Sequence, residues 1–472
     1  MQGLSVRVRG AVRDVGFHSL VRQLAERYEL TGWARSNDRE IEIELEGSEA
    51  GLERFLRDLR ERAPPRVRID EVQVIDRPSS GFKTFEVGEN EADEKRQYVP
   101  PDEVDLPFTA SHDILACGAQ RKGTYCLVTG SKAYLSQDFG DLERPETLEH
   151  FEASLKSTRR LFQLEPQVIA HDMDPNFVST HFAHDYPAAS AIRVAVQHHH
   201  AHVVSAMVDR GLERPVIGVA YDGGGYGTDG AVWGGEILVA DWQSFERAAH
   251  IRYAPLIGGE AAIRHPYRMA AAYVWSLCAA SVSEFESFLA TLPIGERIIL
   301  RRQLEAELHT PLTSSCERLS DGAAAMLGVR REAEYEGQPA LELEAIADPE
   351  VEDVYPYDVI RRGDGWIIDP AALFRALWCE YRAGRRVPHI AAAFHNSIAS
   401  FTLAACAQVR EARGLNQVVL SGGCFRNALL TRRLVDSLSS AGFQAFTHSR
   451  VPPDDGGLSL GQAAVAHALT SG

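Results

Sequence analysis

The sequence predicts an α/β protein in two parts, a small α/β sandwich followed by a larger α/β region of two lobes that close on a cleft. In the first part, short apolar strands alternate with two stretches of helical period. In the second, strands that end in glycine turns alternate with long helical patterns, which favours layers of helices on sheets. A charged stretch ending in Pro100-Pro101 has little to bury, as expected of a linker. We therefore expect domains at residues 1–90 and 109–472, joined by a linker at residues 91–108.

Each expected element rests on apolar residues that recur at the period of a strand or of a helix. In the first part, the strands are expected at residues 4–8, 41–45 and 72–75, and the helices at residues 18–28 and 50–62. In the second part, the strands are expected at residues 113–117, 125–128, 168–170, 216–220, 235–240 and 418–420, and the helices at residues 149–164, 201–210 and 395–413. This alternation is what predicts the α/β class.

The composition indicates a globular protein without an extended nucleic-acid partner. A chain of 472 residues with 45% hydrophobic residues is long enough to bury more than one core. Its formal net charge of −17 repels a phosphate backbone. No apolar run reaches the length of a signal peptide's core or of a membrane span, so we expect a cytoplasmic protein with no membrane partner. Seven dispersed cysteines without a Cys-x-x-Cys pair indicate reduced thiols.

A run of histidines is the strongest local signal of chemistry. His198 and His202 stand four residues apart, so on a helix their imidazoles lie one turn apart on one face, where two nitrogens can share a metal ion. His199 and His200 point to other faces. Twenty positions beyond His202, Asp222 opens a Gly-Gly-Gly run whose backbone N–H groups can face a phosphate. The sequence therefore predicts a metal site beside a nucleotide site.

The amino-terminal part resembles the acylphosphatase family. The resemblance rests on Val-Arg-Gly-Ala-Val-Arg-Asp-Val-Gly-Phe-His at residues 8–18 and on Leu-Thr-Gly-Trp-Ala at residues 30–34. In that family an arginine follows Val-Gly-Phe and an asparagine positions water, whereas here these positions hold His18 and Ser36, with Asn37 one residue late. Because imidazole is a poor replacement for a bidentate guanidinium, we expect a ferredoxin-like acylphosphatase sandwich without efficient hydrolysis.

The larger part resembles the HypF family of hydrogenase-maturation carbamoyltransferases over residues 109–472. The resemblance rests on motifs that occur in the same order, which is stronger evidence than any one glycine run. They are Ser136-Gln-Asp-Phe-Gly-Asp-Leu142, Gln197-His-His-His-Ala-His202, Asp222-Gly-Gly-Gly-Tyr-Gly227, Trp233-Gly-Gly-Glu236, Tyr335-Glu-Gly-Gln-Pro339, Ser421-Gly-Gly-Cys-Phe-Arg-Asn427 and Pro453-Asp-Asp-Gly-Gly-Leu-Ser-Leu-Gly461.

This resemblance implies a two-lobed actin-like ATPase (ASKHA) fold that binds ATP or carbamoyl-adenylate and one divalent metal, iron or zinc. The implied metal ligands are His198, His202, Asp222 and Asp455. The implied nucleotide-binding residues are Gly223, Gly224, Gly225, Asp321, Gly422, Gly423 and Asn427, with Asp321 at the ribose and Arg264 at the carbamoyl or phosphate group. The sequence departs from the family at Glu317, where a glycine is usual, and at Ser320, where an aromatic residue is usual.

The resemblance also implies the reaction and its partners. In the family, carbamoyl phosphate and ATP yield carbamoyl-adenylate, AMP leaves, and the carbamoyl group passes to the carboxy-terminal cysteine of a HypE-type acceptor for cyanide ligand synthesis. The family's cysteine-rich zinc finger and YrdC-like domain, where carbamoyl-adenylate is made, have no counterpart between the two parts of this sequence. A separate YrdC-like protein is therefore an expected partner.

Two other functions remain open at this point. One is O-carbamoylation of a small molecule, whose enzymes share the metal motif but lack an acylphosphatase domain. The other is a non-catalytic scaffold or regulator of the full-length maturation factor, favoured by the missing domain and by His18 in place of arginine. Threonylcarbamoylation of tRNA is disfavoured by the acidic charge.

Overall fold

The computed structural model describes residues 2–11, 21, 24–25, 27–36, 41–61, 68–77, 81–89, 99–188 and 190–471. The chain divides into two compact units, Met1–Val99 and Pro100–Gly472. Each unit has its own hydrophobic core, and together they confirm the α/β class.

The first unit is a helix-covered sheet of five strands in the order β4-β1-β3-β2-β5. The strands are β1 (Gln2–Ala11), β2 (Thr31–Ser36), β3 (Ile41–Gly47), β4 (Arg68–Arg77) and β5 (Phe85–Glu89), and α2 spans Glu49–Glu61. Neighbouring strands are antiparallel except β2 and β5. The apolar side chains of β1 and β3 form one buried core with Leu52, Phe55 and Leu59 of α2. Of the helix expected at residues 18–28, only residues 21, 24, 25, 27 and 28 are described, and the first four are helical.

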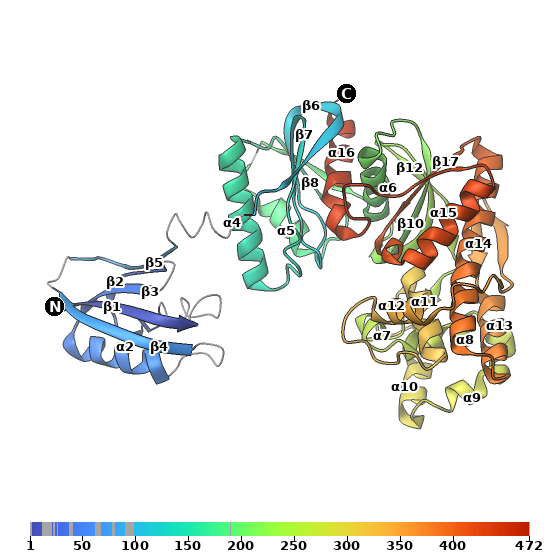
Figure 1. The fold of residues 1–472 in the computed structure, drawn as a ribbon, viewed down its shortest axis with the longest axis horizontal. Helices are drawn as coiled ribbons and strands as arrows, with labels where there is room; N and C mark the ends of the chain where they lie inside the picture. Colours follow the sequence, from blue (N-terminus) through green and yellow to red (C-terminus); the bar gives the residue numbers. More distant parts are fainter. Residues whose placement is uncertain are drawn as a thin grey trace. The chain divides into compact units, whose positions relative to one another are not determined.

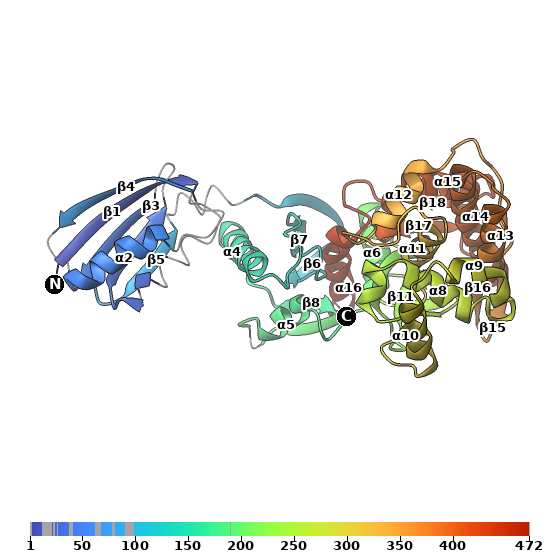
Figure 2. The same ribbon diagram turned by 90° about the horizontal axis from the view of Figure 1, so that it is seen from below.

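The second unit contains two sheets (Figures 1 and 2). The first has the order β7-β6-β8-β9 and consists of β6 (Asp102–Ala116), β7 (Cys126–Leu135), β8 (Val168–Asp172) and β9 (Ile192–Val196). The second has the path β15-β16-β12-β11-β10-β17-β18, with β13 and β14 beside it. Its strands are β10 (Val216–Tyr226), β11 (Val232–Ala240), β12 (Phe245–Ile251), β13 (Ala254–Pro255), β14 (Leu312–Thr313), β15 (Asp358–Arg362), β16 (Gly365–Asp369), β17 (Gln417–Ser421) and β18 (Gln444–Phe446).

Strand β6 begins earlier than the sequence indicated. Residues 102–108, which were expected to lie in the linker, pair with β7 or continue toward that pairing. The linker is therefore shorter at its carboxyl end than expected, because Val104 and Leu106 are buried rather than solvated.

Two helices fill the space between the sheets, as Figure 1 shows. Helix α6 (His198–Asp209) packs on β10, β11 and β17 of the second sheet, and α16 (Leu458–Thr470) packs on β6, β7 and β8 of the first. The helices also pack against each other, closest where Gly461 meets the backbone of Ala201. Their buried apolar side chains form one core with both sheets. This contact brings the histidine run next to the segment that precedes α16.

The remaining helices surround this centre. We call the first sheet of the second unit with its helices the first lobe, and the second sheet with its helices the second lobe. The helices of the first lobe are α4 (Pro145–Phe162) and α5 (Val178–Asp185). Those of the second lobe are α7 (Glu260–Arg264), α8 (Tyr267–Ser276), α9 (Glu286–Leu289), α10 (Ile294–Glu305), α11 (Cys316–Met326), α12 (Gln338–Ile346), α13 (Ala371–Arg382), α14 (Val387–Arg413) and α15 (Ala428–Ser440). By length and composition α14 passes as a membrane span, but 78% of its apolar window is buried inside the fold. It is therefore a core helix.

We predict that Gly461→Ala weakens the contact between α6 and α16. A Cβ atom at this position would lie 1.9 Å from the carbonyl oxygen of Ala201, so the helices must move apart. Overpacking of this kind costs about 1–3 kcal/mol, measured as a lower urea midpoint by circular dichroism. Gly295→Ala in α10 is the matched control, because no described atom outside its own stretch of helix lies within 4 Å of its Cβ position. Equal midpoints for the two variants would contradict the packing argument.

Candidate functional site

Four side chains from three separate segments converge at the inner end of a cleft in the second unit. We call His198, His202, Asp222 and Asp455 the four-ligand cluster, since one ligand atom from each lies within 4.8 Å of the others. Gln197 starts α6 because its side chain accepts a hydrogen bond from the backbone N–H of His200. His198 and His202 are thus both helical and one turn apart, as the spacing predicted. Asp222 lies in β10, and Asp455 begins the 3₁₀ turn before α16.

A buried carboxylate orients the first imidazole. The carboxylate of Asp172 lies 2.7 Å from Nδ1 of His198, and neither side chain is exposed by more than 1%. Because an ionised carboxylate only accepts, Nδ1 carries the hydrogen and donates it. Nε2, on the other side of the ring, then faces Asp222 at 3.4 Å and Asp455 at 3.5 Å, where it can hold either a proton or a metal ion. Carboxylate–histidine pairs orient metal ligands in this way.

The second imidazole faces the same two carboxylates. Nε2 of His202 lies 3.3 Å from Asp455 and 3.8 Å from Asp222. The other oxygen of Asp222 accepts a hydrogen bond of 2.8 Å from the backbone N–H of Gly423, which fixes the carboxylate. Neither His198 nor His202 has a hydrogen-bond partner for Nε2 among the described residues. Two orphaned imidazole nitrogens and two carboxylates fit a borderline divalent ion such as iron or zinc.

The protonation states of the four side chains in the cluster depend on one another. Burial lowers the pKa of His198 and His202, but Asp222 and Asp455 outweigh it and raise both pKa values, and Asp172 also raises that of His198. Burial also opposes ionisation of Asp222 and Asp455, yet the imidazoles hold both pKa values below the usual range. The buried carboxylates therefore require positive charge beside them, from protons or from a metal ion.

Glycine is required where β10 passes the cluster. A Cβ atom on Gly225 would lie 2.7 Å from the ring of His198, so the imidazole occupies the space that a side chain would fill. Gly422 has φ +106°, and its Cβ would lie 2.1 Å from the backbone of Tyr221. These two glycines allow the ends of β10 and β17 to approach α6 and each other.

A cleft of about 750 Å³ opens from the cluster toward solvent. Asp222 and Asp455 line it, while His198 and His202 lie buried behind them. Of the residues expected to bind nucleotide, Gly223, Gly224, Gly225, Gly423 and Asn427 line the cleft. The structure therefore brings both glycine loops to the candidate metal ligands.

Two expected contacts are absent from the described lining of the cleft. Asp321, expected at the ribose, is 1% exposed and forms an ion pair with Nε of Arg318 at 2.8 Å. Arg264, expected at the carbamoyl or phosphate group, ends α7 with an exposed side chain, and Glu260 and Ile263 of that helix line the cleft instead. Gly422 supports the loop from behind and does not line the cleft itself.

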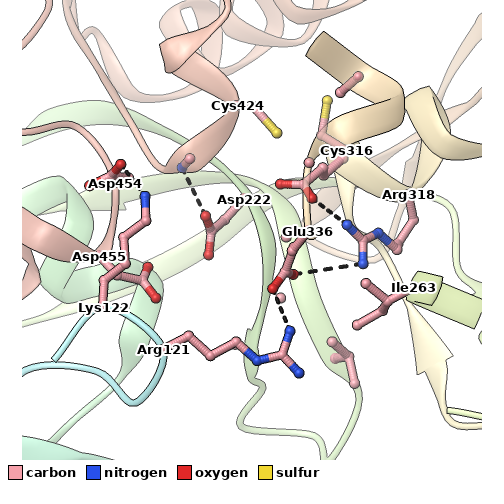
Figure 3. Close-up of a pocket in the computed structure, with 18 of the residues that line it drawn as sticks. Arg121, Lys122, Asp222, Ile263, Cys316, Arg318, Glu336, Cys424, Asp454 and Asp455 are labelled. Carbon is pink, nitrogen blue, oxygen red and sulfur yellow. Dashed lines mark hydrogen bonds and ion pairs between the residues drawn. The ribbon is translucent and has the colours of Figure 1, made fainter. Parts of the chain in front are cut away.

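The cationic residues of the cleft were not expected from the sequence. Arg121 contacts Glu336 and lies 3.0 Å from Glu260, and Lys122 pairs with Asp454 (Figure 3). Arg121 and Lys122 lie in the turn between β6 and β7 of the first lobe, far in sequence from the second-lobe acids. Only the tertiary structure brings them together, so no local pattern indicated them.

Glu317 places a carboxyl group between the glycine loops. Its side chain is 12% exposed and pairs with Arg318, while Oε2 lies 3.2 Å from where a Cβ of Gly223 would stand. Burial raises the pKa of Glu317 to about 8, although Arg318 opposes the shift. The departure from the family glycine therefore adds a group that is neutral at neutral pH and charged in mild base.

The acylphosphatase-equivalent positions lie at the edge of what the structure describes. His18 and Asn37 are outside the described residues, and Ser36 ends β2, where its backbone pairs with Ile41 and Glu89. Their roles remain predictions.

The second unit has a two-lobed α/β fold with a candidate metal cluster at the inner end of its cleft. Comparison with known proteins shows which family of two-lobed proteins the chain belongs to. Residues 218–462 match the family described as "Carbamoyltransferase, Kae1-like Domain, second subdomain", residues 109–209 match the HypF Kae1-like domain, and residues 4–87 match acylphosphatase. The chain belongs to the HypF carbamoyltransferase family.

Three relatives show how much of the family architecture is present. Carbamoyltransferase HypF2 of Cupriavidus necator is 36% identical over 380 residues, which are 75% of this chain and 46% of the relative. Carbamoyltransferase HypF of Synechocystis sp. is 34% identical, over 77% of this chain and 48% of the relative. The chain thus spans about half the length of these two relatives. It covers 93% of a third, the "Carbamoyltransferase HypF homolog" of Cupriavidus necator, at 36% identity and over 76% of this chain.

Solved structures agree with the fold. A full-length HypF in a phosphate- and nucleotide-bound form superposes with a TM-score of 0.76 at 39% identity, covering 79% of this chain and 58% of that one. The superposition with HypF of T. kodakarensis has a TM-score of 0.71 and covers 100% of this chain and 99% of the T. kodakarensis chain. At 18% sequence identity this similarity supports the fold alone.

We predict that His202→Ala abolishes stoichiometric binding of zinc or iron(II). The loss should exceed the roughly 10–100-fold typical of removing a supporting hydrogen bond, because a ligand itself is removed. His200→Gln is the matched control, since His200 lies in the same run but bonds the backbone carbonyl of Asp241 at 2.7 Å. Metal content after dialysis, measured by inductively coupled plasma mass spectrometry, checks both. Equal metal content in the two variants would contradict the site.

We predict that nucleotide affinity falls as pH rises through about 8. Below that pH the carboxyl group of Glu317 is protonated, and above it the ionised group repels a phosphate beside Gly223. Calorimetric titration with ATP should show an affinity loss of up to about tenfold per pH unit above the pKa. Glu317→Gln cannot ionise, so its affinity should vary less. Parallel pH profiles for wild type and Glu317→Gln would show that this carboxyl group does not face the phosphate.

Proposed function

We propose that this protein is a carbamoyltransferase of nickel–iron hydrogenase maturation. It would transfer the carbamoyl group of carbamoyl-adenylate to the carboxy-terminal cysteine of a HypE-type acceptor. The observation that supports this most strongly is the four-ligand cluster at the inner end of a cleft, directly beside both glycine loops. Membership of the HypF carbamoyltransferase family supports the same reaction.

The charge of the cleft supports a divalent ion as part of the ligand site. Eight acidic and five basic side chains line the cleft. Three of the cations, Arg121, Lys122 and Arg318, are already paired with acids. An anionic ligand such as carbamoyl-adenylate would therefore meet net negative charge. A divalent ion on the cluster offsets that repulsion locally, in a site where few charges are screened by water.

The residues of this chain have separate tasks in the proposed reaction. The backbone at Gly223 to Gly225 lines the cleft beside the cluster and would face a phosphate or carbamoyl oxygen, with the carboxyl group of Glu317 next to Gly223. Asn427 caps α15 through its side-chain oxygen, so its amide is held at the cleft wall. Asp172 and Gly423 hold His198 and Asp222 in place. When bound, a metal ion would supply Lewis-acid stabilisation of negative charge on the ligand.

The chemical step is a substitution at the carbamoyl carbon. The acceptor thiolate forms a C–S bond, the C–O bond to the adenylate phosphate breaks, and AMP leaves with the electron pair. No side chain of this protein need become covalently attached. The protein's contribution is to hold the ligand and to exclude water until the acceptor arrives.

The source of the activated carbamoyl group is the second part of the proposal. The chain spans about half the length of two HypF relatives, 46% of one and 48% of the other. We propose that a separate YrdC-like protein makes carbamoyl-adenylate from carbamoyl phosphate and ATP and passes it to this cleft.

The test combines the purified protein with carbamoyl phosphate, ATP and a HypE-type acceptor, with and without a YrdC-like protein. Mass spectrometry of the acceptor's carboxy-terminal peptide should show one added carbamoyl group only when the YrdC-like protein is present. Asp455→Asn should reduce the yield at least 100-fold. Loss of a group that only supports a metal ligand costs about 10–100-fold, and Asp455 is a candidate ligand itself. His200→Gln should transfer normally.

The outcomes distinguish the other functions. Modification of a small hydroxyl compound instead of the acceptor would favour O-carbamoylation. Absence of transfer, together with absence of metal and nucleotide binding, would overturn the proposal in favour of a scaffold.

A further inference from the structure

The two histidines of the four-ligand cluster are supported by different groups. Nδ1 of His198 faces the carboxylate of Asp172 at 2.7 Å, whereas Nδ1 of His202 faces the hydroxyl of Ser421 at 3.5 Å. Ser421 is the last residue of β17 and is fully buried. A hydroxyl both donates and accepts, so it does not fix the tautomer of an imidazole unless something fixes the hydroxyl.

A second buried histidine fixes that hydroxyl. Nε2 of His448 lies 2.8 Å from Oγ of Ser421, and Nδ1 of His448 faces the carboxylate of Asp209 at 3.8 Å. The side chains of His448 and Asp209 are 4% and 0% exposed. The backbone carbonyl of Pro453 is the other described neighbour of Ser421 Oγ, at the longer distance of 3.3 Å.

The direction of each hydrogen bond follows from the number of hydrogens. Burial lowers the pKa of His448 to about 4, with His202 and Arg210 acting in the same direction and Asp209 and Asp454 opposing, so the imidazole is neutral. We place its one hydrogen on Nδ1, because the negative carboxylate of Asp209 lies on that side at 3.8 Å, beyond hydrogen-bond distance, and Nε2 is then the acceptor. Ser421 then donates its single hydrogen to His448 and accepts from Nδ1 of His202. With a metal ion bound in place of a proton, Nε2 of His202 then offers its lone pair on the side of Asp222 and Asp455.

The same acid also ties the helix to the loop that carries Asp455. Asp209 ends α6, and its carboxylate accepts backbone hydrogen bonds from Ser449 at 2.5 Å and from Arg450 at 3.1 Å. The chain from His448 therefore leaves this anchor and reaches Asp455 within a few residues. The carboxylate of Asp209 thus faces His448 and also ties the end of α6 to the segment that leads to the fourth ligand.

We propose that Ser421 and His448 are positioning residues, which hold His202 in the tautomer whose Nε2 can bind a metal ion. The proposal deepens the proposed function, because it rests on a metal ion at the four-ligand cluster. It assigns the two residues no contact with the substrate. Their effect should appear as metal affinity before any transfer takes place.

The test measures zinc affinity of the full chain by competition with a chromophoric chelator. Ser421→Ala removes the acceptor for Nδ1–H of His202 and should weaken zinc binding about 10–100-fold, as loss of such partners does. Ser421→Thr keeps the hydroxyl as both donor and acceptor and should bind zinc within about threefold of wild type. Ser397→Ala is the matched control, because it also deletes a buried serine hydroxyl, in α14.

A second pair of variants tests the far end of the chain of hydrogen bonds. His448→Phe keeps a planar ring but offers no acceptor, so zinc affinity should fall. His448→Gln offers a carbonyl oxygen to Ser421 and should retain most of it. In zinc-loaded wild type labelled with ¹⁵N-histidine, the His202 resonance should report hydrogen on Nδ1 and metal on Nε2, and the resonance is assigned by its loss in His202→Ala.

The outcomes separate this proposal from the proposed function. Folded Ser421→Ala and His448→Phe proteins that bind zinc as tightly as Ser397→Ala would overturn the positioning role and leave carbamoyl transfer standing. Weakened zinc binding in those variants, with wild-type protein that never carbamoylates an acceptor, would support the positioning role and overturn the function. Wild-type protein that binds no zinc or iron would overturn both.

Discussion

The burial of two carboxylates beside two imidazoles is the constraint on which the rest of this structure depends. Asp222 and Asp455 lie at the inner end of the cleft, where water screens charge poorly, and each keeps a lowered pKa only because His198 and His202 face it. Removing one partner of a buried charged group leaves the others uncompensated, which is strongly unfavourable. The four residues therefore form one unit, and the surrounding fold must hold segments that are far apart in sequence within one ion's reach.

The packing of α6 on α16 meets that requirement. Gly461 lets the helices touch at the backbone of Ala201, and Gly225 lets β10 pass the ring of His198. Each sheet supports one helix, so the cluster lies where the two lobes meet. A movement of one lobe against the other would therefore change the distance between the histidines and the cleft's first-lobe cations. This couples the geometry of ligand binding to that of the candidate metal site.

The sequence predicted the parts of this arrangement that are local. The spacing of His198 and His202 predicted a shared helical face, because helical period is a property of neighbouring residues. Resemblance supplied Asp222 and Asp455, which no short-range pattern joins to the histidines. Strands β2 and β5 were missed, since each is short and carries glycine or charged residues that weaken the strand pattern. The linker is shorter than the sequence predicted. Val104 and Leu106 are buried in β6, but two alternating apolar residues are too few to indicate a strand from the sequence.

The site residues that escaped prediction share one property, in that tertiary contact alone defines them. Asp172, Ser421 and His448 support the histidines from three different elements. Asp321 was expected at the ribose, but it lies three residues after Arg318 on α11 and turns inward to pair with it. Sequence does not reveal which face of a buried helix lines a cavity. Glu317 was visible as a departure from the family pattern, yet its position between the glycine loops came only from the fold.

The most direct measurement of the central claim is X-ray absorption at the metal edge of protein purified with zinc. The account predicts one zinc ion per chain with two imidazole ligands at about 2.0–2.1 Å, completed by oxygen ligands. His202→Ala should remove that signal. A zinc ion coordinated by sulfur would contradict the four-ligand cluster as a metal centre. So would wild-type protein in which most chains hold no tightly bound ion.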